Sequence, residues 1–275
     1  MYRLFSLHPS SFLYFRRMIH VKPKKRLGQH FLNDKSIASD IVEALSPDTK
    51  HLIEIGPGTG VLTDFILQKN IPDFKIVEID VESVDYLLQK HPPLKDQLIS
   101  GDFLKLNLKE LFNENFAIVG NFPYNISSQI LFKVWDDRDI VDEVVGMFQK
   151  EVAERVAAQP GKKTYGILSV LLQAFYDIEY LFTVSEEVFT PPPKVKSGVI
   201  RLRRNQVQKL EVEESAFKAV VKTAFNQRRK TISNSLKSLG FKDHLDELGH
   251  LAIKRPEQLG VAEFIEITKV LSKQP

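Results

Sequence analysis

The chain has 275 residues, a net charge of +3 and no cysteine. It is long enough for one large domain of about 200 residues with a small companion, and the lack of cysteine excludes disulfides and thiolate metal sites. The seven histidines show no metal-ligand spacing and no apolar run reaches about 18 residues, so the sequence predicts a site without metal and no membrane span.

Positive charge is concentrated in two stretches. Residues 1–33 hold seven Lys or Arg and no acid, a charge of +7. Residues 194–230 hold eleven Lys or Arg against three Glu, a charge of +8, so the rest of the chain carries −12. This segregation predicts two basic surfaces that bind a polyanion, with two solvated basic faces as the alternative.

The first 17 residues are aromatic, contain arginine and lack acid, as in a transit peptide or an amphipathic anchor. Translation from Met18 is the simpler interpretation, and we expect residues 1–21 to be a disordered extension. A basic arm, K-P-K-K-R-L-G-Q-H-F-L-N-D, follows over residues 22–34 and leads into a helix with Asn33 or Asp34 as its N-cap.

A glycine-rich turn follows the first predicted strand. Leu52–Ile55 has the pattern of a buried parallel strand, residues 56–60 read G-P-G-T-G, and helical spacing begins at Val61. Such a turn lets the backbone pass close under a nucleotide-type cofactor. A dinucleotide loop prefers G-x-G-x-x-G and offers N–H groups to a pyrophosphate, whereas Pro57 lacks one. The spacing therefore favours S-adenosylmethionine (SAM) over NAD, with a plain tight turn as the alternative.

Three more strands are predicted at residues 75–80, 97–103 and 116–120. Glu78 lies 22 residues past Gly56, the distance at which a βαβ unit presents a carboxylate to a ribose diol; the alternative is a cap for the next helix. Asp102 is placed to accept a hydrogen bond from an adenine amino group. The first and fourth strands should flank the reversal of strand order, so their carboxyl-end loops should share one crevice.

The rest of the chain divides into strand-rich and helical parts. Strands are predicted at 143–148, 178–184 and 198–203, with helices at 151–158 and 166–175 and a rigid extended connection at 190–193. Beyond about Asn205 the strand pattern stops, and helices are predicted at 215–225, 229–239 and 263–271. The sequence thus predicts an α/β, Rossmann-like methyltransferase sheet over 22–205 and a small all-helical domain over 206–275.

The fourth strand runs into Asn121-Phe122-Pro123-Tyr124. Because proline biases the preceding residue to the extended region, the Phe122 carbonyl and the Asn121 side-chain oxygen form two acceptors in one small space. Accepting both hydrogens of an exocyclic amine would turn the nitrogen lone pair toward an electrophilic methyl. Tyr124 offers a flat face on which a flipped or unpaired base stacks. The alternative is an Asn-x-Pro turn with a packed tyrosine.

Several longer motifs stand along the chain: R-L-G-Q-H-F-L at 26–32, E-I-G-P-G-T-G at 54–60, G-N-F-P-Y-N-I-S at 120–127, F-Q-K-E-V-A-E-R at 148–155, P-G-K-K-T-Y-G-I-L-S-V at 160–170, V-F-T-P-P-P-K-V-K-S at 188–197 and A-F-N-Q-R-R-K-T at 224–231. With these motifs, residues 22–272 resemble the small-subunit ribosomal RNA adenine dimethyltransferases. That family places two methyls on each of two adjacent adenosines near the 3′ end of the RNA.

The resemblance implies roles for individual residues. The residues that would contact SAM are His30, Leu32, Gly56, Glu78, Asp102 and Asn121. The residues that would hold the adenine are Asn121, Phe122 and Tyr124, with Phe189 near the target base. Many members have Asn at the position of His30, and Leu or Pro at that of Phe122. The residues that would bind RNA phosphates are Lys24, Lys25, Arg26, Arg228, Arg229 and Lys230. The resemblance further implies a metal-free, cytoplasmic monomer that acts on small-subunit RNA in a pre-ribosomal particle.

Three alternatives stay open from the sequence. The first is the related group that dimethylates an adenosine of large-subunit RNA and confers macrolide resistance. The segment around 153–166 is more similar to the small-subunit branch. The second is an assembly or transcription factor that kept the fold and lost catalysis. The third is a DNA adenine methyltransferase, which would usually carry a separate target-recognition domain.

Overall fold

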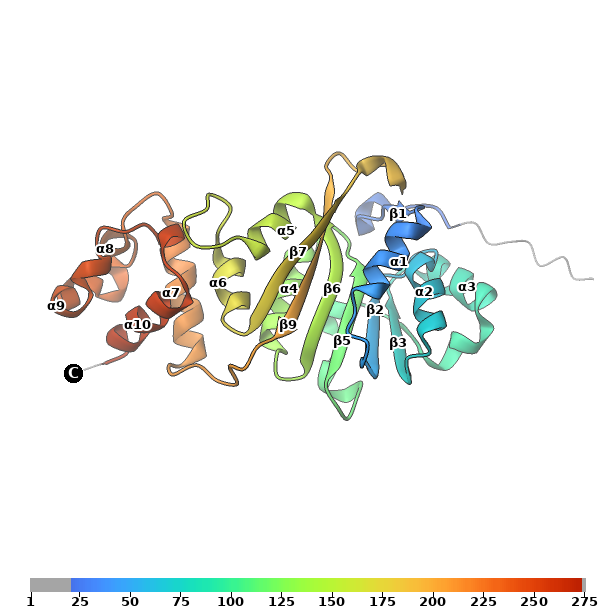
Figure 1. Cartoon of the computed structure of the whole chain (residues 1–275), viewed down its shortest axis with the longest axis horizontal. Helices are drawn as coiled ribbons and strands as arrows, with labels where there is room; N and C mark the ends of the chain where they lie inside the picture. Colours follow the sequence, from blue (N-terminus) through green and yellow to red (C-terminus); the bar gives the residue numbers. More distant parts are fainter. Residues whose placement is uncertain (1–20, 274–275) are drawn as a thin grey trace, which may run out of the picture.

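A computed structural model describes residues 21–273 and shows a seven-stranded sheet with a helical segment at one end (Figure 1). The predictions for residues 1–20, including the start at Met18 and the transit peptide, lie outside the described residues. Within residues 21–273 no helix is long and apolar enough to cross a membrane.

The strand order of the sheet is β4-β3-β2-β5-β6-β9-β7. The strands are β2 (His51–Ile55), β3 (Asp73–Glu78), β4 (Leu98–Ser100), β5 (Phe116–Asn121), β6 (Val141–Gln149), β7 (Tyr176–Val184) and β9 (Ser197–Arg204). Neighbours from β4 to β6 are parallel, and β9 is antiparallel to both β6 and β7. The chain starts the sheet at β2 and returns beside it at β5, so the predicted reversal of strand order between the first and fourth strands is confirmed.

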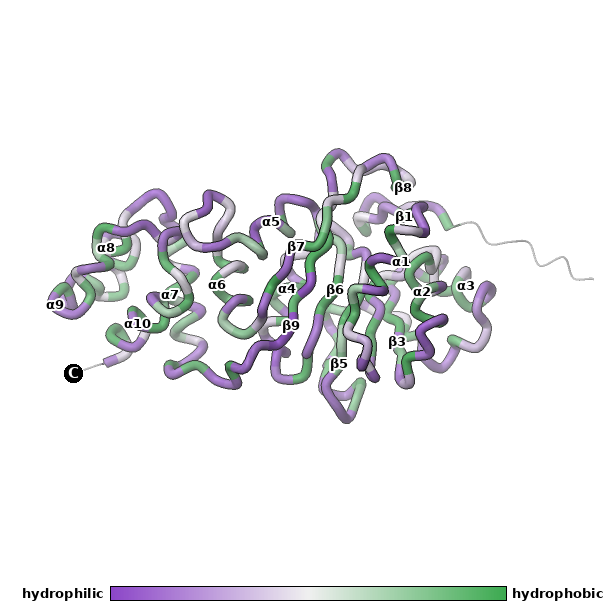
Figure 2. Tube along the Cα trace, in the orientation of Figure 1, coloured by the Kyte–Doolittle hydropathy of each residue, from purple (hydrophilic) through white to green (hydrophobic). Residues whose placement is uncertain are grey.

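Helices cover both faces of the sheet. They are α1 (Lys35–Glu43), α2 (Val61–Ile66), α3 (Val81–Lys90), α4 (Ser127–Asp136), α5 (Lys150–Ala157) and α6 (Ile167–Gln173). Leu52 and Ala117 belong to an apolar cluster with α1 and α2, whereas their neighbours Ile53 and Ile118 belong to a cluster with α4, α5 and α6. Alternate residues of a strand point to opposite faces, which explains why these strands are apolar throughout. Figure 2 shows hydrophobic and hydrophilic residues interleaved along the helices and strands, with further hydrophilic stretches in the loops.

A second, two-stranded sheet forms where the sequence predicts only an arm and a rigid connection. It pairs β1 (Phe31–Leu32) with β8 (Phe189–Thr190) in antiparallel register, with Leu32 opposite Phe189. The Asn33 amide donates to the Val188 carbonyl at 2.8 Å and extends the pairing by one bond. Asp34 is the N-cap of α1 and accepts from the amides of Ser36 and Ile37, as one of the two predicted caps.

The helical segment contains α7 (Glu214–Asn226), α8 (Ile232–Ser235), α9 (Leu245–Leu248) and α10 (Val261–Leu271), joined by short 3₁₀ turns. The predicted helix at 229–239 is confirmed only in part, since α8 and a 3₁₀ turn, Lys237–Leu239, lie inside it but residues 229–231 are not helical. The Lys230 amide donates back to the Gln227 carbonyl in a turn, and the Ile232 amide donates to the distant carbonyl of Lys254. These bonds replace only the first turn of the helix that the local pattern predicted.

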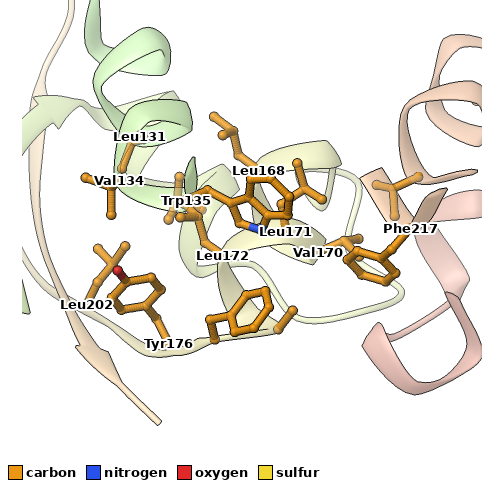
Figure 3. Packing of buried hydrophobic residues seen from close by; sticks show 14 of the residues in the cluster. Leu131, Val134, Trp135, Leu168, Val170, Leu171, Leu172, Tyr176, Leu202 and Phe217 are labelled. Atoms are coloured by element: carbon orange, nitrogen blue, oxygen red, sulfur yellow. The ribbon is translucent and has the colours of Figure 1, made fainter. Parts of the chain in front are cut away.

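The helical segment shares a core with the sheet. Figure 3 shows Trp135 of α4 and Leu168 and Leu171 of α6 between the strand residues and Phe217 of α7. Arg138, buried just after α4, donates to the Trp135 carbonyl at 3.0 Å and forms an ion pair with Glu214 at the start of α7. Because apolar and ionic contacts both cross this junction, the boundary near residue 205 stays a prediction.

A pair of facing glycines makes room for one aromatic ring. Gly120 of β5 pairs with Gly146 of β6, and the Phe122 ring lies over both. A Cβ at Gly146 would lie 1.9 Å from Cε2 of Phe122, far inside contact distance. Phe122 is 1% exposed and packs on Phe148 with ring centroids 4.7 Å apart, so it has little space to move aside.

We predict that Gly146→Ala lowers the free energy of unfolding by about 1–3 kcal/mol, because the added methyl overpacks the core against Phe122. Urea unfolding measures this change. Gly249→Ala is the matched control, since a Cβ there meets no atom within 4 Å and its stability should be nearly unchanged. Equal stabilities of the two variants would show that the Phe122 ring is not confined.

Candidate active site

One pocket opens at the carboxyl ends of β2, β3 and β5. It has about 1090 Å³ of empty space, which includes its open mouth. The predicted residues that line it are His30, Leu32, Gly56, Glu78, Asp102, Asn121, Phe122 and Tyr124. Every residue predicted for SAM or for the amine-binding loop therefore meets in one place. Phe189 is not part of the lining, because its side chain is buried in the core beside β1.

The backbone amides of the glycine loop donate hydrogen bonds to groups within the protein. Gly56, Gly58 and Gly60 have φ of +64°, +56° and +75°, a region that side chains disfavour. Their N–H groups donate to the Val77 carbonyl, to Glu78 Oε2 and to the Pro57 carbonyl at 2.9, 3.1 and 2.8 Å. With Pro57 lacking an N–H, four of the five positions 56–60 have no amide to offer a pyrophosphate. This loop fits a cofactor without a pyrophosphate.

Glu78 ends β3 and is directed at the glycine loop. Its Oε1 accepts from the Asp80 amide at 2.8 Å and its Oε2 from the Gly58 amide at 3.1 Å. Burial raises the pKa of Glu78, although these amide bonds favour the carboxylate. The N-cap of α3 is Asp80, so the alternative in which Glu78 only caps that helix does not hold. Glu78 is free to present an oxygen to a ribose diol from the pocket wall.

Asp102 lies on the pocket wall beyond β4. Its Oδ1 accepts from the Leu104 amide at 3.0 Å and caps a 3₁₀ turn, Phe103–Lys105. The cap holds the carboxyl group at the rim of the pocket, where Phe103 and Leu104 supply apolar wall. This setting is compatible with a carboxylate that accepts from an adenine amino group between apolar side chains.

Asn121 is the last residue of β5, and one hydrogen bond fixes the orientation of its side-chain amide. Nδ2 donates to the His30 carbonyl at 3.0 Å, which leaves Oδ1 as the acceptor of the amide group. The His30 ring stacks on Tyr124 with centroids 5.4 Å apart, and its Nδ1 lies 2.7 Å from the Pro191 carbonyl. His30 thus joins the arm to the Asn121–Tyr124 loop and to the segment after β8.

Tyr124 is tethered at its hydroxyl. The Tyr124 oxygen lies 2.5 Å from Oγ of Ser197, which is fully buried at the start of β9. Burial raises the pKa of Tyr124, so its phenol stays neutral at physiological pH and keeps this hydrogen bond. The ring is therefore held as a fixed plane at the pocket mouth.

The N-terminal arm is fastened along one wall of the pocket. Lys24 forms ion pairs with Asp80 and, at 3.2 Å, with Glu82, while Gln29 Nε2 donates to Asp80 at 3.1 Å. Although burial acts to raise the pKa of Asp80, its hydrogen bonds from Lys24 and Gln29 lower it below the usual value. Sequence reasoning missed these contacts between the arm and Asp80. The only local signal for them is that Asp80 is a second acid two residues after Glu78.

The predicted RNA-binding residues divide into two groups. Lys24 and Arg228 have internal partners: Lys24 binds Asp80, and Arg228 donates to the Lys163 carbonyl. The exposed members are Lys25, Arg26, Arg229 and Lys230. None of these basic residues is part of the pocket lining, although the Asn125 side chain after the reaction loop donates to the Arg26 carbonyl at 3.4 Å. Within residues 21–273 no group of three or more His, Asp or Glu side chains is placed to hold a metal ion.

Comparisons with known proteins show the family of the chain. The ribosomal RNA adenine dimethylase family matches residues 20–273. The ribosomal RNA small subunit methyltransferase A of Cytophaga hutchinsonii is 59% identical over 257 residues, which cover 93% of this chain and 99% of that protein. The protein of the same name from Phocaeicola vulgatus is 58% identical over 251 residues, covering 90% and 89%.

Two solved structures are similar over most of the chain. A dimethyladenosine transferase from Plasmodium falciparum has a TM-score of 0.71 and 25% identity, covering 86% of this chain and 96% of that one. The 23S rRNA methyltransferase ErmE has a TM-score of 0.63 and 26% identity, covering 88% and 100%.

Glu54, beneath the glycine loop, is 1% exposed and accepts from the Thr63 hydroxyl at 2.7 Å. Burial raises its pKa to about 8. Because this folded-state value exceeds the ordinary one, the stability that Glu54 contributes is present in full below about pH 4.5 and is lost as the pH rises toward 8.

We predict that Glu54→Gln, which cannot ionise, is more stable than the parent at pH 8 by at least about 1 kcal/mol and that this advantage shrinks by pH 5. Unfolding in urea at a series of pH values measures it. The control Glu187→Gln changes an exposed carboxylate and should show no such trend. A pH-independent difference for Glu54→Gln would mean that Glu54 ionises normally.

Proposed function

The chain belongs to the ribosomal RNA adenine dimethylase family, and we propose that its reaction takes place at the Asn121–Tyr124 loop in the pocket described above. It is a SAM-dependent enzyme that methylates the N6 amines of two adjacent adenosines near the 3′ end of small-subunit rRNA, giving N6,N6-dimethyladenosines. The relatives at 54–59% identity favour this activity over the large-subunit and non-catalytic alternatives.

The observation that carries the proposal is the orientation of the Asn121 amide. Nδ2 donates to the His30 carbonyl, which fixes how the amide group is turned and so the position of Oδ1, the acceptor atom of the group. The Phe122 ring is confined over Gly120 and Gly146, which holds the backbone beside it and with it the second acceptor, the Phe122 carbonyl. Two acceptors in the same small space suit an amine that has two hydrogens.

The pocket residues supply binding for the methyl donor. Bound SAM provides an electrophilic methyl group on sulfur. Glu78 would accept from the ribose hydroxyls, Asp102 would accept from the adenine amino group, and the glycine loop would allow the close approach of the cofactor. Leu32 and His30 belong to the arm that covers this side of the pocket.

Asn121 Oδ1 and the Phe122 carbonyl accept the two N6 hydrogens of the target adenine. They favour a more tetrahedral nitrogen whose lone pair points at the methyl carbon, so the N–C bond forms as the S–C bond breaks. The extra proton on nitrogen then leaves to water, so no strong base is needed. Tyr124 holds the flipped base by stacking.

The partner of the enzyme is small-subunit RNA in a pre-ribosomal particle. The exposed Lys25, Arg26, Arg229 and Lys230 support this part of the proposal, because phosphate contacts dominate RNA affinity. Phe189 can meet the base only if β8 moves, since its side chain is buried. We further propose that the enzyme acts as a monomer in the cytoplasm.

We predict that the protein binds SAM and not NAD, and that Glu78→Ala weakens SAM binding about 10- to 100-fold, through loss of hydrogen bonds to a charged group. Calorimetry on the purified protein measures both. Asp85→Ala, which removes an exposed carboxylate from α3, is the control and should bind SAM normally. Binding of NAD without SAM, or full SAM affinity in Glu78→Ala, contradicts the assignment.

A second prediction separates the roles inside the reaction loop. Asn121→Ala should lower methyl transfer about 100-fold or more, because it removes a preorganised polar group. Tyr124→Ala should lose stacking and fall about 5- to 150-fold, which corresponds to roughly 1–3 kcal/mol. Phe122 acts through its backbone carbonyl, which Phe122→Leu retains, so this variant should keep most of its activity per folded molecule. Its free energy of unfolding should fall by less than about 1.5 kcal/mol.

The measurement is single-turnover methyl transfer from labelled SAM to small-subunit particles that lack the modification. Tyr124→Phe is the matched control, since it keeps the ring and loses only the bond to Ser197. Near-parent transfer by Asn121→Ala would show that the two-acceptor mechanism is incorrect.

A further inference from the structure

Glu78 accepts backbone hydrogen bonds from residues that the N-terminal arm also touches. Two of its donors are the amides of Gly58 and Asp80, at 3.1 and 2.8 Å. The Phe31 ring of the arm lies over Gly58, where a Cβ would be 2.7 Å from the Cε1 atom of that ring. Asp80 meets the arm as well, through its side chain. The arm is therefore in contact with two residues that orient Glu78.

Asp80 is the residue to which the arm is attached on this side of the pocket. Its side chain is 1% exposed and accepts from Nζ of Lys24, from Nε2 of Gln29 at 3.1 Å and from the Ser83 hydroxyl at 3.3 Å. Gln29 also closes the arm on itself, because its Oε1 accepts from the Lys24 amide at 2.8 Å. A buried carboxylate is unfavourable unless its donors are in place, so Asp80 favours the docked position of the arm.

Other residues of the same arm are bound to the reaction loop and to the residue that follows it. The His30 carbonyl accepts from Asn121 Nδ2 at 3.0 Å. The Arg26 carbonyl accepts from Asn125 Nδ2 at 3.4 Å. The arm thus crosses the pocket from Asp80 to the reaction loop, and a displacement of the arm would affect both sides.

Lys24 and Asp80 themselves stand outside the pocket. Neither is among the residues that line it, whereas Gln29 and Leu32 of the arm are. A substitution at Lys24 or Asp80 therefore acts on a bound cofactor only through the arm or through Glu78. This separation distinguishes an effect of positioning from the loss of a direct contact with the cofactor.

We propose that Asp80 is a positioning residue that couples docking of the arm to the binding of SAM. Its carboxylate holds Lys24 and Gln29, its amide orients Glu78, and the docked arm is the form that binds the cofactor tightly. This inference rests on the proposed role of Glu78 toward the ribose. The apparent affinity for SAM falls in proportion to the fraction of molecules whose arm is docked, so a weaker attachment lowers affinity without the loss of a cofactor contact.

The first experiment measures SAM binding by calorimetry on the full chain for Lys24→Met and Asp80→Asn. Met keeps the apolar stem of Lys24, and Asn keeps the N-cap of α3 while it removes the charge that holds the arm. We expect SAM affinity to fall about 5- to 30-fold in each variant, because each loses a charged hydrogen bond of the docked arm. At saturating SAM, methyl transfer should return to near the parent rate, so that KM for SAM rises and kcat does not.

The matched control is Lys22→Met, which changes another lysine of the arm that is exposed. Its SAM affinity should be that of the parent. In a double-mutant cycle, Lys24→Met should have little further effect in the Asp80→Asn protein, because the contact that it removes is already lost. Fully additive losses, or parent-level SAM affinity in both single variants, would overturn the role of Asp80.

A second measurement tests docking of the arm in the absence of cofactor, by hydrogen exchange and mass spectrometry. The peptide 25–34 includes the Asn33 amide, which donates to the Val188 carbonyl at 2.8 Å when the arm is docked. This peptide should exchange faster in Lys24→Met and Asp80→Asn than in the parent and in Lys22→Met. Addition of SAM should slow its exchange in the parent.

The two measurements together separate the possible failures. Faster exchange of the arm with unchanged SAM affinity, or weaker SAM binding with unchanged exchange, would overturn the coupling. A parent protein that binds no SAM would count against the proposed function itself. SAM binding by the parent beside unaffected variants would count against the role of Asp80 alone.

Discussion

The candidate site depends on one constraint of the sheet: β2 and β5 are parallel neighbours that the chain reaches far apart in sequence. Leu52 pairs with Ala117 and Glu54 with Val119, so both strands end at the same edge. The glycine loop follows β2 and the Asn121 loop follows β5. In the proposed reaction, a methyl donor on the first loop and an amine on the second would therefore meet at one edge of the sheet.

The arm turns this open crevice into a pocket with fixed walls. It is held at Lys24 by Asp80, at His30 by the Asn121 side chain and at Leu32 by Phe189. Each contact joins the arm to a different element that borders the site. The arm therefore orients the groups that would hold cofactor and base, besides covering them, which is what preorganised catalysis requires.

Charge in this protein has two separate uses. Lys24, Arg138 and Arg228 are bound to carboxylates or carbonyls and hold segments together. Arg229 and Lys230 are exposed and belong to the residues proposed to bind RNA. A count of basic residues cannot separate the two uses, because the same side chain type serves for both, and only the position of its partner decides.

The sequence by itself determined the strands of the large sheet, the reversal of strand order between the first and fourth of them, and the residues that meet in the pocket, because periodicity, glycine spacing and strand ends are local properties. It could not determine the pairing of Phe31 with Thr190, the turn at Arg229, or the contact of Asn121 with the His30 carbonyl. The first and the last join segments that lie far apart in the chain, and two-residue strands or single turns carry no periodic pattern. Local propensity predicts a helix from 229, but α8 begins only at Ile232, whose amide donates to the distant carbonyl of Lys254. Only the tertiary structure decided which basic residues stayed free to meet RNA.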